Sequence, residues 1–139
     1  MKRNGILNSS ISSVLSSMGH PNSICIGDCG LPIPDETKRI DLALRFNIPS
    51  FLETLDAVTD DMAVESYILA EEMKDHNPEM LENIRGMMKK KFPDAVECFT
   101  SHENLKDQTK TCKAVIRTGE ITAFANIILV SACIFAAQG

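Results

Sequence analysis

The sequence is short of positive charge, and this shortage excludes two classes of partner. Its 14 Lys and Arg residues are outnumbered by 19 Asp and Glu residues, which gives a net charge of −5 and a pI near 5.1. Nucleic acids and anionic membrane surfaces bind basic patches. The basic run Lys89 to Lys91 is expected to form the solvated last turn of a helix, where the helix dipole favours it. We therefore expect no nucleic-acid partner and no membrane partner.

Long apolar runs are also missing. The longest, residues 127–137, is interrupted by Ser131 and is too short to span a bilayer. A polar, serine-rich stretch follows Lys2 and Arg3, so we expect no signal peptide. Together these features predict a soluble cytoplasmic protein.

Cysteines at metal-binding or redox spacing are absent as well. The chain has five cysteines, an odd number, and no Cys-x-x-Cys motif. Cys25 and Cys29 lie in or near an extended segment, which holds their Cα atoms about 13 Å apart, beyond disulfide reach. A metal cluster of His20, Cys25 and Cys29 is one interpretation. Buried, reduced thiols of a cytosolic protein are the favoured one.

What the sequence does contain is an alternation of helical and extended patterns. Apolar residues at 11, 14, 15 and 18 share one face of a helix, which Asn8 or Ser9 can cap and Gly19 can end. Further helices are expected over 50–58, from Asn77-Pro78, with Asn77 as the cap, to a break at 92–94, and after Ser101. Strands are expected over 23–27, 39–44, 96–100 and 114–117 and from near Asn126. Residues 62–73 fit either a helix or a buried strand. This interleaving predicts an α/β fold, in one domain over residues 1–139.

The most informative segment joins a histidine, an aspartate and a stiff loop. His20 follows the first helix, where the dipole favours the imidazolium form, and Asp28 ends the strand that comes next. Ligands of α/β proteins gather beyond the carboxyl ends of strands, and a His/Asp pair suits proton transfer. A Leu-Pro-Ile-Pro loop follows, in which proline fixes the backbone. A capping or turn role for the aspartate stays open.

Other polar residues are less distinctive. His102 and Lys106 share one face of the helix after Ser101, a pair that on spacing alone is typical of a solvated surface. The same holds for His76 in its Asp-His-Asn-Pro turn. Asn126 precedes the last strand; its amide can bind a sugar hydroxyl or its own backbone.

Taken together, these segments carry a resemblance to a known family. "NSSISSVLSSMGHPNSICIGDCGLPIP" over residues 8–34 resembles the N-terminal signature of the D-ribose pyranase family, which is related to fucose mutarotases. The resemblance continues through "RIDLAL" at 39–44, "VTDDM" at 58–62, "AEEMKDHNP" at 70–78, "AVIRTGE" at 114–120 and "ANIIL" at 125–129. It spans nearly the whole chain, and its elements occur in the same order.

The resemblance implies a fold, a reaction and a site. The fold is a central mixed sheet flanked by helices, with a strand in the ambiguous segment after Met62. The reaction is the interconversion of the pyranose and furanose forms of free D-ribose by acid–base ring opening, without cofactor or metal. The absence of Gly-rich phosphate-binding motifs agrees with an unphosphorylated sugar. His20 matches the proton donor, and the sugar-binding residues are Asp28, His102, Lys106, Phe124 and Asn126.

The family also implies a homo-oligomer, typically a decamer of two pentameric rings with the site near a subunit boundary. At two positions this chain departs from the family: Phe124 stands where Tyr is usual, and Cys29 stands where Ala is usual. The first change removes a phenolic hydrogen bond to the sugar. Two alternatives remain: a non-catalytic sugar-binding accessory protein of ribose uptake, and a mutarotase for a related sugar such as fucose.

Overall fold

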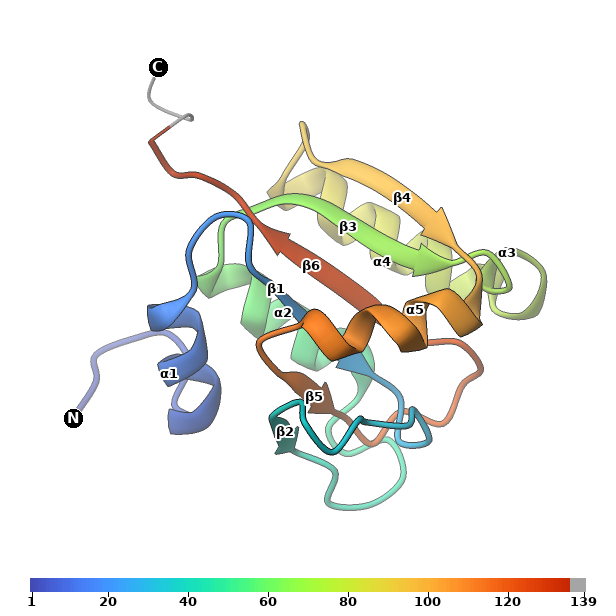
Figure 1. Ribbon diagram of the computed structural model, residues 1–139, viewed down its shortest axis with the longest axis horizontal. Coiled ribbons are helices and arrows are strands. Elements are labelled where there is room, and N and C mark those ends of the chain that lie inside the picture. Colours follow the sequence, from blue (N-terminus) through green and yellow to red (C-terminus); the bar gives the residue numbers. More distant parts are fainter. Residues whose placement is uncertain (136–139) are drawn as a thin grey trace.

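The computed structural model describes residues 1–135 of the chain, and these form a mixed sheet with helices on both faces (Figure 1). The strands are β1 (Ser23–Gly27), β2 (Arg39–Asp41), β3 (Val64–Ala70), β4 (Val96–Thr100), β5 (Val115–Arg117) and β6 (Ile127–Ser131), in the order β2-β5-β1-β6-β3-β4. The pairs β1–β5, β2–β5 and β3–β4 are parallel, whereas β6 runs antiparallel to its neighbours β1 and β3. The carboxyl ends of β1 to β5 therefore meet the amino end of β6 at one edge of the sheet.

Three of the five helices in residues 1–135 begin where a short polar side chain caps them. They are α1 (Ser9–Ser17), α2 (Phe51–Asp61), α3 (Met73–His76), α4 (Pro78–Lys91) and α5 (His102–Gln108), and a short 3₁₀ turn η1 (Thr109–Thr111) follows α5. The side chains of Asn8, Ser50 and Ser101 accept backbone N–H bonds at the starts of α1, α2 and α5. Figure 1 shows α2 and α4 behind the sheet and α5 in front of it.

The sheet has a packed core on each face because side chains alternate along its strands. In β1, Ile24 and Ile26 join the core that α2 and α4 cover, while Cys25 joins the smaller core under α5 with Leu105 and Ile128. All five side chains are at most 2% exposed. Burial of such an apolar side chain contributes about 1.5–3 kcal/mol, so these contacts fix the position of the central strands between the two layers.

The predicted α/β fold is confirmed, and residues 62–73 contain a strand, β3, which the resemblance favoured. Three predicted boundaries are wrong. The strand expected over 39–44 ends at Asp41, because the Asp41 side chain accepts the Ala43 N–H at 3.0 Å and turns the chain away from the sheet. The helix expected over 50–58 continues to Asp61. Helix α1 ends before Gly19, with Met18 already extended and its N–H bonded to Leu15 O.

The remaining boundaries differ from the predictions by a residue or less. β5 begins at Val115 and β6 at Ile127, while β1 and β4 have the predicted bounds. The last four residues of the expected domain, 136–139, lie outside the described part. Within residues 1–135, no helix combines the length and the apolar character that crossing a bilayer requires.

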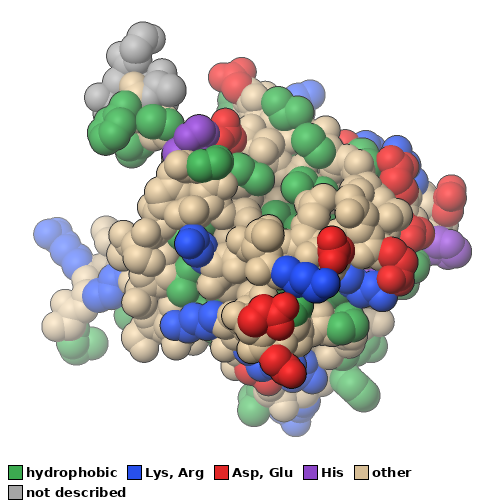
Figure 2. All heavy atoms as spheres, viewed as in Figure 1, with side chains coloured by type: hydrophobic (Ala, Val, Ile, Leu, Met, Phe, Trp, Pro, Cys, Tyr) green, Lys and Arg blue, Asp and Glu red, His purple; other side chains and the backbone are tan. Residues whose placement is uncertain are grey.

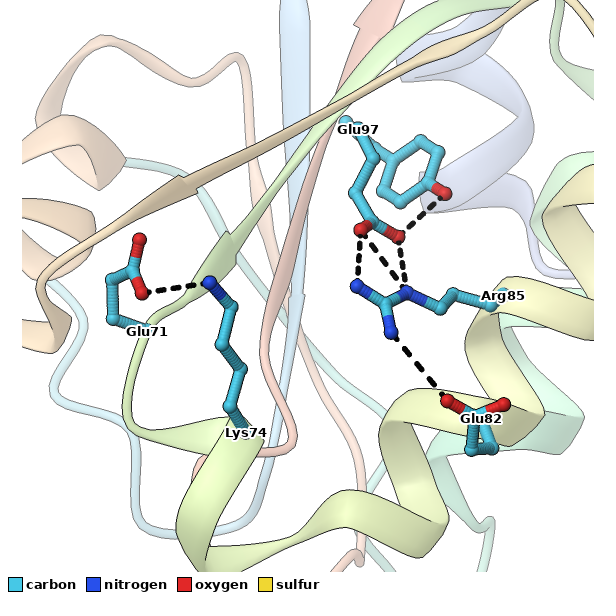
Figure 3. Close-up of polar contacts among 6 residues, drawn as sticks. Glu71, Lys74, Glu82, Arg85 and Glu97 are labelled. Atoms are coloured by element: carbon cyan, nitrogen blue, oxygen red, sulfur yellow. Dashed lines mark hydrogen bonds and ion pairs between the residues drawn. The ribbon is translucent and has the colours of Figure 1, made fainter.

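A polar cluster on the outer strands joins α4 to the sheet (Figure 3). This Glu97 cluster consists of Tyr67, Arg85 and Glu97. Arg85 donates to both Glu97 carboxylate oxygens, with an Nη2–Oε1 distance of 2.7 Å, and the Tyr67 hydroxyl donates to Oε2 at 3.0 Å. Arg85 lowers the pKa of Glu97, while burial and Glu97 raise the pKa of Tyr67 to about 12. Every carboxylate oxygen of the cluster has a partner.

Candidate active site

The candidate site lies at the edge where the parallel strands end and β6 begins. Asp28 follows β1, Asn126 precedes β6, and the Asp28 N–H donates to the Asn126 side-chain oxygen at 3.0 Å. Gly27 permits this approach: a Cβ there would lie 2.6 Å from Leu31 and 3.0 Å from the Asn126 oxygen. The fold thus joins an aspartate and an asparagine that are 98 positions apart.

His102 reaches the same edge from β4. As the first residue of α5, it follows the end of that strand, and its N–H donates to both carboxylate oxygens of Glu72, at 3.0 and 3.1 Å. Its ring stands edge-on to Phe124, with the centroids 5.0 Å apart and the planes at 82°. Contacts on the backbone and on the ring therefore fix this imidazole.

Two buried polar atoms of the site have no hydrogen-bond partner within residues 1–135. They are Nδ1 of His102 and Nδ2 of Asn126, and Asn126 is fully buried. Native proteins rarely leave buried polar groups unpaired, because each costs about 1–3 kcal/mol. The Asn126 nitrogen is a donor, and an imidazole nitrogen can donate or accept. A polar ligand with hydroxyl groups would satisfy both.

The Asp28 carboxyl sits beside these atoms. Burial raises its pKa, and the Gly30 N–H at 2.9 Å and the nearby His102 oppose that rise. A half-buried carboxyl of this kind can accept a hydroxyl hydrogen bond and exchange a proton with a ligand. Among Asp28, His102 and Asn126, the Asp28 carboxyl is the group best suited to acid–base chemistry.

Phe124 supplies an apolar wall. Its backbone lies in the left-handed region with φ of 58°, which is costly for a bulky residue. Its ring lies near His102 and also near His76, with a centroid distance of 5.5 Å to the second imidazole. Small-molecule sites commonly combine such an aromatic surface with a few fixed polar groups.

The structure does not bring Lys106 into this cluster. Its ammonium group forms an ion pair with Glu103 at 2.6 Å on the surface of α5, one turn from His102. The shared helix face that the spacing predicted is present, but the lysine contact that the structure shows is with Glu103.

His20 lies at the opposite edge of the sheet. It precedes β1, and its Nε2 pairs with Glu65 near the start of β3. The five residues of β1 separate it from Asp28 by about 16 Å at the usual rise of a strand. Figure 2 shows histidine side chains at two opposite ends of the molecule in this view. The expected His20–Asp28 pair therefore does not form within one chain.

Sequence reasoning missed two residues that shape the site. Glu72 holds the His102 backbone; it lies in the "AEEMKDHNP" segment of the resemblance, but the sequence pattern indicated no role for it. Asn77 was predicted to cap α4; it stands at the cap position but makes no capping bond. Its side chain instead donates to Thr122 Oγ1 at 3.0 Å and to Ala123 O at 2.8 Å. A cap and a tertiary contact look the same in sequence, so no local signal separated them.

Two other features lie apart from this edge. A cavity of about 730 Å³ between the N-terminal segment and α2 contains none of the predicted site residues. In the part of the chain that the structure describes, no three His, Cys, Asp or Glu side chains gather as metal ligands, and the alternative cluster of His20, Cys25 and Cys29 is not formed. All five cysteines are free thiols.

Comparison with known proteins places this chain in a family. The model of the RbsD / FucU transport protein family matches residues 1–134. The chain is 54% identical to a D-ribose pyranase of Clostridium tetani over 97% of its own length and 100% of that protein. It is 52% identical to a D-ribose pyranase of Geobacillus thermodenitrificans over 93% and 95% of the two chains.

Solved structures support the same family assignment. The structure of Bacillus subtilis RbsD complexed with D-ribose superposes with a TM-score of 0.89 at 42% identity, over 95% of this chain and 98% of that one. A fucose mutarotase from Streptococcus pneumoniae, in complex with L-fucose, shares the fold with a TM-score of 0.73 at 21% identity, over 89% and 91% of the two chains. The chain belongs to the RbsD / FucU family.

Proposed function

We propose that this protein is an isomerase that interconverts the pyranose and furanose forms of free D-ribose. The observation that carries the proposal is the pair of unpartnered buried atoms on His102 and Asn126, which lie beside the Asp28 carboxyl at the ligand-binding edge of the sheet. The proteins named D-ribose pyranase that are similar to it over nearly its full length support the same reaction and the same sugar.

The chemistry needs only positioned acids and bases. A cyclic sugar opens when its anomeric hydroxyl loses a proton and its ring oxygen gains one, and it recloses through O4 or O5. Asp28 binds a hydroxyl or relays its proton, Asn126 donates to a sugar oxygen, and His102 holds a second hydroxyl. Each positioned acid or base is typically worth about 10²–10⁴ in rate. Phe124 packs against the carbon face of the sugar, without the phenolic bond that tyrosine would add.

The proton donor, in this proposal, is His20 of a neighbouring chain in a homo-oligomer. Within one chain His20 is a strand length from Asp28, so the site is complete only if another copy brings its imidazole to this edge. The edge carries exposed apolar side chains suited to burial in an interface, with Phe46 at 75% and Ile121 at 54% exposure. A groove of about 360 Å³, which Cys29 and Phe46 help to line, lies beside them. We assign the assembly as a decamer of two pentameric rings, as the family resemblance implies.

Two further assignments belong to this proposal. Lys106 joins the sugar site when its bond to Glu103 is exchanged for one to a sugar hydroxyl. The protein acts in the cytoplasm, an assignment supported by its five free cysteines, since disulfides are rare there.

Magnetization-transfer NMR on D-ribose tests the reaction. Exchange between pyranose and furanose resonances is expected to accelerate with the protein, and the acceleration is expected to disappear in His20→Ala and Asp28→Asn. Ribose binding without faster exchange would instead favour the sugar-binding accessory protein. The same measurement on L-fucose separates the two mutarotase alternatives.

Mixing inactive variants tests the shared site. His20→Ala and Asp28→Asn chains are co-expressed, so that some sites combine an intact His20 from one chain with an intact Asp28 from another. Random mixing in a symmetric oligomer would restore about a quarter of the sites. No recovery, in particles that light scattering shows to contain both chains, would place His20 outside the site. The decamer itself predicts a particle of ten times the 15.3 kDa chain mass.

A further inference from the structure

We propose that Asn77 is a positioning residue that holds the segment Thr122–Phe124, here called the wall loop, against the sugar site; this rests on the proposed function. Asn77 stands at the start of α4, where a side chain of this type normally caps the helix. Its amide forgoes that bond and donates instead to Thr122 Oγ1 at 3.0 Å and Ala123 O at 2.8 Å. Asn77 therefore contacts both wall-loop residues that precede Phe124.

The backbone conformation of the wall loop requires a restraint from outside the loop. Phe124 has φ of 58°, a backbone conformation that costs a bulky residue of order 1–3 kcal/mol and persists only when its surroundings impose it. Thr122 and Ala123 are exposed, so the packing of their own side chains restrains them little. The Asn77 amide supplies a restraint from another element of the fold.

A chain of hydrogen bonds carries the restraint across the edge. Thr122 Oγ1, which accepts from Asn77, donates in turn to Glu120 Oε2 at 2.8 Å. Glu120 is buried, and its other carboxylate oxygen accepts the Phe51 N–H at 3.0 Å at the start of α2. Its backbone oxygen accepts the Cys29 N–H at 2.9 Å, next to Asp28. The starts of α4 and α2 thus hold the wall loop between them.

The wall loop reaches the sugar-binding groups through the Phe124 ring. This ring lies near the imidazoles of His76 and His102, with centroid distances of 5.5 and 5.0 Å. The chain continues two residues later into Asn126, whose N–H bonds to Phe124 O at 2.8 Å. A shift of the wall loop would therefore move the aromatic wall, the edge contact of His102 and the approach to Asn126 together.

Asn77→Asp separates this role from a structural one. Aspartate is as good a helix cap as asparagine and its charge suits the start of α4, but it has no N–H to give to the wall loop. We expect the half-saturating ribose concentration to rise about ten-fold, since small displacements of positioning groups cost one to two orders of magnitude. The rate at saturation should change less, and Tm should not fall. Glu79→Gln, in the same first turn and exposed, is the matched control: it removes a charge at the start of α4 and should leave the two kinetic quantities unchanged.

Thr122→Val tests the route through the wall loop. It removes one of the two Asn77 acceptors and the hydroxyl that donates to Glu120, so its effect and that of Asn77→Asp should be non-additive in the double variant. Additive effects, an unchanged half-saturating concentration in Asn77→Asp, or a loss of activity only in step with a lower Tm would each overturn the proposal. If the wild-type protein fails to accelerate ribose exchange, the proposed function falls; a crystal structure of Asn77→Asp then decides the restraint alone, by a displaced or an unmoved wall loop.

Discussion

The Glu97 cluster and the candidate site are both polar groups set against the sheet, yet their hydrogen bonds are completed to different degrees. In the Glu97 cluster, Arg85 and Tyr67 between them occupy both oxygens of the carboxylate (Figure 3). In the site, His102 Nδ1 and Asn126 Nδ2 are buried and unpaired, and burial raises the pKa of Asp28. The first arrangement stabilises the chain by itself; the second does so only when something else binds.

This contrast separates a structural cluster from a functional one without reference to any relative. A carboxylate whose pKa is lowered by its partners favours the folded state at neutral pH. A carboxyl whose pKa is raised by burial opposes folding there, which a protein tolerates where the group has chemistry to perform.

The largest expected effect is on catalysis, from Asn126→Ala. The change removes the free donor, and it also leaves the Asp28 N–H without its acceptor. Loss of one preorganised donor typically lowers the rate about 10²–10³-fold, which ribose exchange by NMR would measure. An exchange rate within ten-fold of wild type would refute a role for this amide.

Arg85→Ala removes the ion pair of the Glu97 cluster instead. The change leaves the Glu97 carboxylate with Tyr67 but without its cationic partner. Because the Arg85 side chain is 41% exposed, the unfolding free energy should fall by only about 1–2 kcal/mol. Urea denaturation measures it, with the exposed Lys90→Ala on the same helix as a control that should stay within ~0.5 kcal/mol. Ribose exchange should not change; a large loss of exchange activity would mean that the two regions are coupled.

The acid dependence of stability sharpens the same comparison. The folded-state pKa of Glu97 is lowered, so the stabilisation is present above the unfolded value near 4.3 and is lost as pH falls through the folded value. Glu97→Gln should therefore be less stable than wild type at pH 7, and the difference should shrink below about pH 4.3. A difference that stayed constant down to pH 3 would contradict the assignment of the ion pair.

The smallest expected effect is a gain in stability, in Asp28→Asn. The folded-state pKa of Asp28 is raised, so its contribution favours folding below the unfolded value near 3.9 and is lost as pH rises through the folded value. Asp28→Asn should remove this penalty at pH 7 and raise Tm by about 1–5 °C. The gain should vanish near pH 3.5, and calorimetry at both pH values would detect a wrong sign.

Local signals predicted most of the fold. Asn8, Ser50 and Ser101 cap helices with their own side chains, and a cap depends only on residues within one turn. The strands read from apolar runs are present for the same reason. Asn77 was misread because its side chain takes a partner 45 positions away, which no local pattern encodes. The antiparallel direction of β6 likewise depends on pairing with strands that are distant in sequence.

For the candidate site, the sequence indicated the residues better than their arrangement in space. The resemblance supplied His102, Phe124 and Asn126, and the fold brings these three to Asp28. Their separation from His20 was within reach of the sequence: a strand of five residues between His20 and Asp28 sets them on opposite edges. Nearness in sequence therefore does not mean nearness in space within one chain.

The place of β6 has a consequence for how the protein is made. This strand is the last of the described chain to be synthesised, yet it lies between β1 and β3 and joins two halves of the sheet, β2-β5-β1 and β3-β4, that pair with it and not with each other. A nascent chain that stops before residue 127 has two separate half-sheets with unpaired inner edges. Closure of the sheet and delivery of the Asn126 amide are therefore one event, and a ribosome must release the chain through β6 before the candidate site is complete.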